Sequence, residues 1–430
     1  MEFKLLKNHH TATREEHQDY SDTLFHLTIS QLMNHPYYSN VLTGFPAGQH
    51  HFNDDTPILT GIKLAQLTKD NPLSMIDDPS GIGITICSGG STGKRKAITH
   101  SRDFFQRMID LGVRAVQASS IETPKAVANC FMAGDMSGAF TFGEGICDKL
   151  GVHYFPVGSK IDPLSLGEII EDFKIDTLFC TPSFAYSLAH RASNLASFSS
   201  LKSIYYVGEL MTNRDAEYIQ SRLNVAIRSL SYTTSELGPI GYQCQGCAHD
   251  TYHINHDAVH IEIIDPTSHK ILPDGHKGEV LVTTYLNDGT PFLRYNTGDL
   301  GMIHQSCNCC ERQSKTIQLF GRTKGSTKVC AFTLEKSLVL DVVSEIVPAT
   351  DNDIQVVIRG NKVDLKLQIL LDSDKFSSQE LTLIENKLTD NYIFKRIISQ
   401  SEVLDFCVTR KHRSDFNKSR MHKTPFFIHS

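Results

Sequence analysis

Short apolar runs that alternate with segments of helical periodicity dominate the middle of this chain, and they constrain its fold more than any other feature. Ile82, Ile84 and Ile86 alternate as in a strand with one buried face. Three later runs are continuous, as in strands that a parallel sheet buries on both faces: 126–132, 177–181 and 204–207. Because helical segments separate these runs, the sequence predicts an α/β body.

Two helix starts can be read from possible capping residues. Ser101 precedes a segment with apolar residues at helical spacing, so we predict that it caps a helix. Ser165 and Glu168 have the spacing of a capping box and predict a second helix that starts there. The first 60 residues or so are polar and histidine-rich and are expected to form surface helices. Three other histidines lack an evident partner and are also expected at the surface: His256, His260 and His304.

The pattern changes after about residue 257. Residues 259–265 and 278–284 alternate apolar with polar side chains across a Pro/Gly turn, which predicts an antiparallel, barrel-like section. Beyond residue 322 the expected elements are strands at 354–358 and 363–371, a helix over 377–392 and a strand near 403–409. The predicted fold is α/β. A large N-terminal body, residues 1–322, combines parallel sheets, flanking helices and the barrel-like section, and a small α+β domain follows at 323–430.

Composition excludes several classes of protein. The chain has 42 Lys and Arg against 48 Asp and Glu, whereas nucleic-acid-binding proteins usually carry a basic face. No apolar run approaches the ~18 residues of a membrane-spanning helix, and the start lacks the apolar segment of a secretory signal. Four cysteines stand singly in apolar segments, as reduced core thiols do: Cys87, Cys130, Cys180 and Cys330. We therefore expect a cytoplasmic enzyme that binds neither nucleic acid nor a membrane.

A glycine-rich segment, Ser88–Lys96 (SGGSTGKRK), directly follows the first predicted strand. Its glycines permit tight turns, and its hydroxyls, amide N–H groups and lysines can surround a phosphate. It is not a Walker loop, because that pattern needs Gly at position 88 and Ser or Thr at position 95, where Ser88 and Arg95 stand. A simple Gly/Ser turn after a strand is the structural alternative.

Three further motifs follow this segment in order: Tyr232–Glu236 (YTTSE), Tyr295–Leu300 (YNTGDL) and Gly321–Arg322. In this order and at these separations, they resemble the adenylate-forming (AMP-binding) superfamily of acyl-CoA synthetases and adenylation domains. The resemblance covers roughly residues 80–420. Within the superfamily the chain looks most like the phenylacetate–CoA ligase branch, on the segments 131–158, 176–188, 205–213 and 260–284.

The resemblance implies an ATP site. Four residues would hold the phosphates: Ser91, Thr92, Gly93 and Lys96. Glu236 would coordinate Mg²⁺, which prefers hard oxygen ligands, and Asp299 would bind both ribose hydroxyls, with Arg322 assisting. The other residues implied in nucleotide binding are Tyr232, against the adenine, and Glu209, Thr234 and Ser235. Taken alone, Glu236 also fits a solvated loop carboxylate, and Asp299 a turn former.

The same resemblance makes the C-terminal domain a mobile lid, with its hinge at Lys324. The catalytic lysine of the superfamily corresponds to Lys418, which would bridge the substrate carboxylate and the α-phosphate. Lys423 is a rival, and a solvated basic tail is the structural alternative. Four positions depart from the family pattern: Gly89, Arg95, Ala331 and Asn417. Ala331 and Asn417 bear more on the second half-reaction, the transfer of the acyl group to a thiol, than on the first, the formation of the acyl-adenylate.

Cysteine pairs form the other strong signal. Cys244-x2-Cys247 and His253 are followed by Cys307-x-Cys309-Cys310. Two short thiol pairs and an imidazole suit a closed, tetrahedral structural Zn²⁺ site, with free thiols or disulfides as the alternatives. The resemblance implies four ligands: Cys307, Cys309, His253 and either Cys244 or Cys247.

The function expected from the resemblance is that of an AMP-forming ligase. A carboxylic acid, aromatic or of medium size and apolar, would attack the α-phosphate of MgATP, and a thiol would then take the acyl group. The acid pocket is expected near 140–142 and 206–209. The acceptor would be coenzyme A or the phosphopantetheine of an acyl carrier protein, and a homodimer is a further expectation. A non-catalytic homologue that serves as partner or assembly protein in a biosynthetic complex is the alternative of another class.

Overall fold

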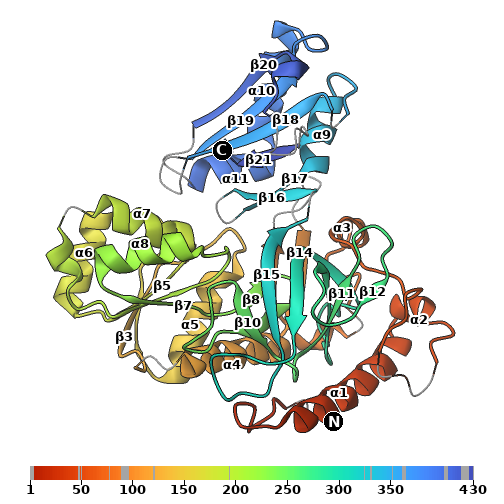
Figure 1. The fold of residues 1–430 in the computed structure, drawn as a ribbon, viewed down its shortest axis with the longest axis vertical. Helices are drawn as coiled ribbons and strands as arrows, with labels where there is room; N and C mark the ends of the chain where they lie inside the picture. Colours follow the sequence, from red (N-terminus) through yellow and green to blue (C-terminus); the bar gives the residue numbers. More distant parts are fainter. Residues whose placement is uncertain are drawn as a thin grey trace. The chain divides into compact units, whose positions relative to one another are not determined.

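The structure is a computed structural model (Figure 1). The described part of the chain forms two compact units. The first unit contains residues 4–88 and 97–321, and the second contains residue 96 and residues 322–429, within the described ranges. The residues described are 4–46, 49, 51–76, 78–88, 96–119, 122–192, 194–323, 325–329, 332–350, 352–360, 365–400, 405–417 and 426–429.

A five-stranded parallel sheet lies in the first unit (Figure 1). Its order is β4-β3-β5-β6-β7, and all neighbouring strands run parallel. The strands are β3 (Ala126–Asn129), β4 (His153–Pro156), β5 (Thr177–Cys180), β6 (Ser203–Tyr206) and β7 (Ala226–Ser229). The three runs predicted as buried parallel strands are therefore confirmed.

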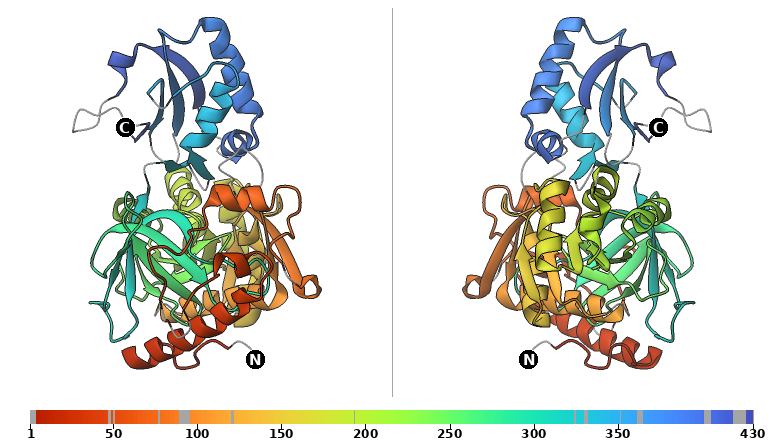
Figure 2. Two further views of the ribbon diagram at one scale, coloured as in Figure 1. Left: turned by 90° about the vertical axis from the view of Figure 1, so that its right-hand side faces the viewer. Right: turned by 90° about the vertical axis from the view of Figure 1, so that its left-hand side faces the viewer.

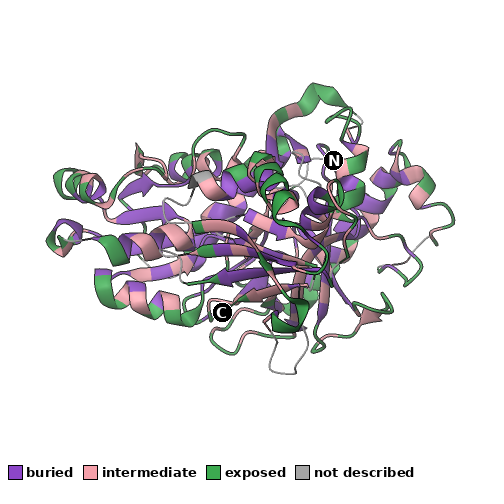
Figure 3. Ribbon diagram, turned by 90° about the horizontal axis from the view of Figure 1, so that it is seen from above, coloured by how far each residue is buried: buried purple, intermediate pink, exposed green. Residues whose placement is uncertain are grey.

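Helices cover both faces of this sheet. One face packs against α4 (Arg102–Ala118) and α5 (Gly138–Leu150), and the other against α6 (Pro163–Phe173), α7 (Pro182–Arg191) and α8 (Asn213–Leu223). Successive strand residues point to opposite faces, so Phe179 joins the first core and Leu178 the second. Figure 3 shows the result, with buried strands between helices whose outer sides are exposed.

The two predicted helix starts have different outcomes. Ser101 caps α4, as predicted, and its side chain accepts the Phe104 N–H. The predicted start at Ser165 is wrong, because Asp162 is the N-cap of α6 and accepts the N–H groups of Leu164 and Ser165. Pro163 occupies the first turn of α6, where its missing N–H costs nothing. An Asp-Pro start therefore precedes and replaces the capping box.

An eight-stranded, largely antiparallel sheet, which contains the YNTGDL motif and the start of the YTTSE motif, also lies in the first unit. Its order is β12-β11-β13-β14-β15-β10-β9-β8. The strands are β8 (Tyr232–Thr234), β9 (Gly238–Tyr242), β10 (Thr251–Ile254), β11 (Val259–Ile264), β12 (Ile271–Leu272), β13 (Gly278–Thr284), β14 (Tyr295–His304) and β15 (Thr316–Arg322). β11 pairs antiparallel with β13, as predicted.

The N-terminal segment is part of the first unit and packs against its eight-stranded sheet. Its elements are α1 (Arg14–Met33), α2 (Tyr38–Val41) and α3 (Gly61–Leu67), and Figure 2 shows α1, in red, along the outer side of the unit. The prediction of surface helices is only half right, because Leu24, Phe25 and Ile29 of α1 lie in a core with Tyr285 and Leu293. Three further short elements are η1 (Pro79–Gly81), β1 (Ile82–Ser88) and β2 (Lys96–Ser101), and η2 (Leu195–Phe198) precedes β6.

The second unit has the predicted α+β composition. A four-stranded sheet of order β20-β19-β18-β21 is covered by three helices that share one apolar core with it. The elements are β16 (Ser326–Val329), β17 (Phe332–Glu335), α9 (Lys336–Ser344), β18 (Ile354–Arg359), β19 (Lys366–Asp372), α10 (Ser378–Asp390), α11 (Tyr392–Gln400), β20 (Asp405–Lys411), η3 (Arg413–Asp415) and β21 (Phe427–His429). No helix in the described part of the chain combines the length and apolar character that crossing a membrane requires.

Candidate functional site

Strands flank the glycine-rich loop on both sides. β1 ends at Ser88 and β2 begins at Lys96. The residues between them lie outside the described residues. They include three predicted phosphate-binding residues, Ser91, Thr92 and Gly93, and two positions that depart from the family pattern, Gly89 and Arg95. The phosphate-binding roles therefore stay a prediction.

Glu236 lies in a tight turn between β8 and β9. Thr234 Oγ1 accepts a backbone N–H within this turn at 3.1 Å, and Gly238 ends the turn with a φ of +68°, which favours glycine. Burial lowers the pKa of His100 to about 4. The neutral imidazole can therefore donate from Nε2 to the Ser235 carbonyl, which lies 2.9 Å away. No motif in the sequence pointed to His100.

Asp299 lies in β14, directly after a glycine with a φ of +73°. Thr297 Oγ1 accepts the backbone N–H of Asp299 at 3.1 Å and donates to the Val280 carbonyl, also at 3.1 Å. The threonine of the YNTGDL motif therefore ties the backbone of Asp299 to the neighbouring strand β13.

Two tyrosine hydroxyls connect these motifs. Tyr232 Oη donates to Asp299 Oδ2 at 2.8 Å, and Tyr295 Oη donates to Glu236 Oε1 at 3.0 Å. The side chains of Glu236 and Tyr295 are 5% and 4% exposed. The structure thus brings together Tyr232, Glu236 and Asp299, three residues predicted from the sequence, and adds Tyr295, to which the sequence analysis gave no role.

Arg294 is a buried cation immediately before Tyr295. Its Nε donates to Glu262 Oε2 at 3.0 Å, and its Nη1 donates to the carbonyl oxygens of Asn53 and Thr56. Burial raises the pKa of Glu262 to about 7, although Arg294 acts to lower it. The signal in the sequence was an arginine within the apolar run PFLRY. This pair fixes the backbone that leads into the YNTGDL motif.

Glu209 and Arg322 have contacts of their own. The Ser183 hydroxyl and backbone N–H donate to the Glu209 carboxylate at 2.5 and 3.2 Å, at the first turn of α7. Arg322 belongs to the second unit and donates from Nε to Ser326 Oγ at 3.3 Å. The nucleotide-binding roles of both residues stay predictions.

The segment of the predicted catalytic lysine is described only up to Asn417. Four predicted positions lie outside the described residues: Lys324, Ala331, Lys418 and Lys423. Gln355 of β18 is fully buried, and its side-chain amide exchanges two hydrogen bonds with the backbone N–H and carbonyl of Asn417, both at 2.8 Å. The residue that precedes Lys418 is therefore fixed to the sheet of the second unit.

Four of the predicted zinc ligands converge. One ligand atom from each of Cys244, Cys247, His253 and Cys307 lies within 4.8 Å of the others. Cys244 Sγ is 3.4 Å from Cys247 Sγ and 4.0 Å from Cys307 Sγ. A tetrahedral ion with Zn–S bonds of about 2.3 Å would separate its sulfurs by about 3.8 Å. The donor set therefore fits zinc.

The fifth predicted ligand, Cys309, lies beside this set. Its Sγ is 3.3 Å from Cys244 Sγ but only 2.6 Å from Cys307 Sγ. Two sulfurs this close do not both fit one tetrahedral ion. The sequence left Cys244 and Cys247 as alternatives, and the structure brings both into the set. A hydrogen bond from Cys247 lowers the pKa of Cys244, which favours the thiolate that a metal requires.

His253 has the environment of a metal-binding imidazole. Its Nδ1 lies 2.8 Å from Ser314 Oγ, and its Nε2 is directed at the thiols, 3.4 Å from Cys310 Sγ. Such a second hydrogen bond orients a metal-bound histidine. Away from this cluster, three cysteines predicted as core thiols are buried and outside any disulfide bond, which confirms the prediction: Cys87, Cys130 and Cys180. Cys330 lies outside the described residues.

Most of the histidines predicted at the surface are buried or half-buried, so the prediction is wrong for them, whereas His51 is exposed as predicted. His9 and His17 are each 3% exposed, and His256, His260 and His304 are half-buried. Their contacts come from distant segments, as in the Lys315 N–H that donates to His256 Nε2 at 3.2 Å. No sequence pattern could reveal these contacts.

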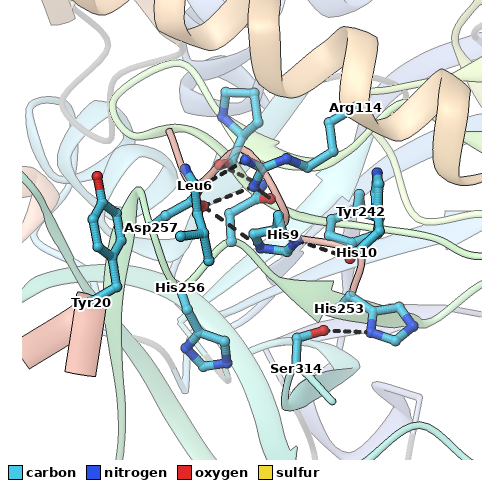
Figure 4. A network of polar contacts seen from close by, with 12 residues as sticks. Leu6, His9, His10, Tyr20, Arg114, Tyr242, His253, His256, Asp257 and Ser314 are labelled. Carbon is cyan, nitrogen blue, oxygen red and sulfur yellow. Dashed lines mark hydrogen bonds and ion pairs between the residues drawn. The ribbon is translucent and has the colours of Figure 1, made fainter. Parts of the chain in front are cut away.

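Asp257 is the charged centre of this histidine cluster (Figure 4). Arg114 donates from Nη1 and Nη2 to its two oxygens at 2.8 and 2.7 Å, and the Leu6 N–H donates at 2.8 Å. His9 Nε2 lies 3.7 Å away. Burial acts to raise the pKa of Asp257, but Arg114 outweighs burial and holds the pKa below its usual value. The carboxylate thus joins the N-terminal segment and α4 to the β10–β11 connection.

Acid should destabilise the folded chain through these histidines. Burial lowers the pKa of His256 from 6.5 to about 3, so in this range only the unfolded chain takes up the proton. The free energy of unfolding should fall by up to about 1.4 kcal/mol for each pH unit below 6.5 through this one histidine. In denaturant titrations between about pH 7.5 and 5, the His256→Gln variant should show a correspondingly shallower pH dependence.

The exposed His276 offers a matched control for this measurement. His276→Gln should keep the pH dependence of the unmodified chain. Equal slopes for the unmodified chain and His256→Gln would contradict the prediction. Any zinc-dependent effect of pH is common to all three proteins and cancels in the comparison.

Comparison with known sequences identifies the family. The family described as AMP-binding enzyme matches residues 46–287, more than half of the chain. A phenylacetate–coenzyme A ligase of Thermus thermophilus is 23% identical over 353 residues, which span 78% of this chain and 77% of the relative. A phenylacetate–coenzyme A ligase of Aromatoleum evansii is 28% identical over 226 residues, 50% of this chain and 49% of the relative.

Solved structures share the fold. The crystal structure of 2-hydroxyisobutyryl-CoA ligase in complex with 2-HIB-AMP and CoA matches with a TM-score of 0.79 and 16% identity, over 98% of this chain and 91% of that one. The amide bond synthetase McbA from Marinactinospora thermotolerans matches with a TM-score of 0.53 and 18% identity, over 80% and 68%. The predicted fold class and the predicted resemblance are thus confirmed. The chain belongs to the AMP-binding enzyme family, and within it resembles the phenylacetate–coenzyme A ligases.

Proposed function

We propose that this enzyme is an AMP-forming ligase that joins a carboxylic acid to a thiol through an acyl-adenylate. The observation that carries the proposal is the pair of carboxylates, Glu236 and Asp299, that Tyr295 and Tyr232 hold by hydrogen bonds. Asp299 would accept the ribose hydroxyls, and Glu236 would offer an oxygen ligand to Mg²⁺. The names of the curated relatives support the same reaction class.

In the first step, a carboxylate oxygen of the acid attacks the α-phosphorus of ATP, and the bond to pyrophosphate breaks. Mg²⁺, when bound, neutralises charge on the phosphate oxygens. The residues proposed to hold the phosphates are Ser91, Thr92, Gly93 and Lys96, with Arg322 assisting Asp299 at the ribose. Lys418 is proposed to stabilise the charge that moves between the acid and the α-phosphate.

In the second step, a thiol sulfur attacks the acyl carbon, the bond from that carbon to the phosphate oxygen breaks, and AMP leaves. We propose coenzyme A as the acceptor and residues 323–430 as a lid that moves between the two steps. A carrier-protein phosphopantetheine is the second candidate, because the exposed Arg410 and Arg413 would suit its acidic surface. The acid is proposed to be aromatic or of medium size and apolar, in a pocket near 140–142 and 206–209.

We further propose a structural Zn²⁺ ion, held by Cys244, Cys247, His253 and Cys307 or Cys309. The two cysteines of the first pair lie in the β9–β10 connection, and those of the second pair in the β14–β15 connection. The ion would therefore tie the strand that follows Glu236 to the strand that carries Asp299. It would stabilise the site without taking part in the reaction.

Exchange of labelled pyrophosphate into ATP, in the presence of a panel of aryl, aryl-acetic and alkyl carboxylic acids, tests the first step. We expect exchange with one class of acid. In Asp299→Ala, exchange should fall at least about 100-fold, because hydrogen bonds of two ribose hydroxyls to a charged group are lost. Coenzyme A and acyl carrier protein are then tried as acceptors, with AMP release as the measurement.

Asp172 is an exposed aspartate on α6, and Asp172→Ala serves as the control with unchanged exchange. Acylation of a carrier protein but not of coenzyme A would reject the CoA-ligase assignment and keep the ligase. Absence of pyrophosphate exchange with every acid of the panel, in a chain that binds MgATP, would favour the non-catalytic homologue. A chain that binds no ATP would overturn the proposal.

A further inference from the structure

The two carboxylates proposed to bind nucleotide each receive a hydrogen bond from a tyrosine of the other motif. Tyr232 belongs to YTTSE and donates to Asp299 of YNTGDL, and Tyr295 belongs to YNTGDL and donates to Glu236 of YTTSE. We call these two residues the reciprocal tyrosine pair. Each motif therefore donates a hydrogen bond that holds the carboxylate of the other motif.

Sheet topology makes these side-chain bonds important. In the sheet order, three strands lie between β8, which carries Tyr232, and β14, which carries Tyr295 and Asp299. The backbone ladder therefore offers no direct hydrogen bond between the two motifs. Their side chains nevertheless approach to 2.8 Å, so side-chain contacts link the two motifs across strands that are not neighbours.

Both tyrosine rings are fixed in the core. Tyr232 is 6% and Tyr295 4% exposed, and both belong to the apolar cluster that fills this sheet. The Tyr295 ring packs edge-on against Phe292, with centroids 5.3 Å apart, and the Tyr232 ring lies 5.9 Å from that of Tyr252. A ring held in this way cannot follow a moving carboxylate, so it is the carboxylate that is held.

The charge of the acceptors makes these bonds strong. A hydroxyl that donates to a carboxylate forms a stronger hydrogen bond than one that donates to a neutral group. One oxygen of each carboxylate accepts a tyrosine proton, which restricts the orientation of the group. A carboxylate fixed before binding loses less conformational entropy when it meets a metal ion or a pair of hydroxyls.

We propose that Tyr295 and Tyr232 are positioning residues, Tyr295 for the Mg²⁺-binding carboxylate of Glu236 and Tyr232 for the ribose-binding carboxylate of Asp299. The inference rests on the nucleotide roles proposed above for these two carboxylates. It assigns a separate consequence to each hydroxyl, because each supports a different function of the site.

The test uses Tyr295→Phe and Tyr232→Phe in the full chain, with two measurements on each. Tyr295→Phe should raise the Mg²⁺ concentration needed for half-maximal pyrophosphate exchange about 10-fold and leave the preference for ATP over 2′-deoxy-ATP unchanged. Tyr232→Phe should reduce that preference about 10-fold and leave the Mg²⁺ requirement unchanged. Combined with Glu236→Gln, Tyr295→Phe should have little further effect, because the two residues act as one unit.

Tyr285 provides the matched control. Its buried hydroxyl belongs to neither motif and lies 2.7 Å from Ser21 Oγ of α1. Tyr285→Phe should lower the stability of the fold without changing either measurement. If both site variants behave like Tyr285→Phe, the hydroxyls are only structural and the proposal is wrong. An identical loss of both properties in the two variants would also overturn it.

Measurements of nucleotide binding test this inference independently of the proposed reaction. If no acid supports exchange, the same two properties are measured by calorimetry, as the Mg²⁺ dependence of ATP binding and as the ratio of the affinities for ATP and 2′-deoxy-ATP. The predicted split between the variants would then support the positioning roles although the reaction is wrong. Absence of nucleotide binding by the unmodified chain would overturn both.

Discussion

Removal of zinc with a chelator should cause the largest loss of stability of any change considered for this chain. A structural zinc site contributes on the order of 10 kcal/mol to folding where its ligands are otherwise unconstrained. Here the ion would close the two connections that bring Cys244 and Cys307 to within 4.0 Å. Metal analysis of chelator-free protein should give about one zinc per chain, and denaturant titration with and without chelator should show the loss.

Variants separate the ligands from other thiols. Cys247→Ser should lose the metal, whereas Cys407→Ser, at a lone half-buried thiol of the second unit, should retain it. Comparison of Cys307→Ser with Cys309→Ser identifies which of the two completes the site. Protein that is metal-free and equally stable with chelator would disprove the zinc proposal. A low count of free thiols in the unfolded chain would then point to the disulfide alternative.

Neutralising Asp257 should cost about 3–5 kcal/mol of folding stability, the range found when one partner of a buried ion pair is removed. In Asp257→Asn, the guanidinium of Arg114 stays charged and buried beside a neutral group. Side-chain exposures of 1% for Asp257 and 8% for Arg114 leave little solvent to compensate. Denaturant titration at neutral pH measures the change.

An exposed ion pair provides the control. Glu122 and Lys202 lie 2.9 Å apart with side chains 76% and 60% exposed, and Glu122→Gln should cost less than about 1 kcal/mol. The double variant Asp257→Asn/Arg114→Met should recover part of the loss, because it removes the unpaired charge. A cost for Asp257→Asn no larger than that for Glu122→Gln would contradict the prediction.

Sequence patterns were sufficient to predict those elements whose local structure follows from neighbouring residues. The parallel strands and the Ser101 cap depend on periodicity and on one hydroxyl, and both were found. The start of α6 was misplaced because two capping signals lie within seven residues and the Asp162–Pro163 signal is the stronger. The motifs YTTSE and YNTGDL were found through a family resemblance rather than through physical reasoning.

Contacts between distant segments were beyond such patterns. Tyr295 and Glu236 are 59 positions apart, and the hydrogen bond between them has no local signature. Most of the histidines were misplaced for the same reason, because their contacts come from distant segments, as in the Lys315 N–H that donates to His256. Composition identifies a histidine as polar and cannot show whether the folded chain encloses it.

The bond between the Leu6 N–H and Asp257 also affects the order in which this protein can fold during its synthesis. Its two partners are separated by 251 positions. At a translation rate of about 5–20 residues per second, Leu6 leaves the ribosome on the order of 10–50 seconds before Asp257. Throughout that interval the N-terminal histidines have no ionic centre to pack around. The N-terminal segment can therefore complete its native contacts only after residue 257 has been made.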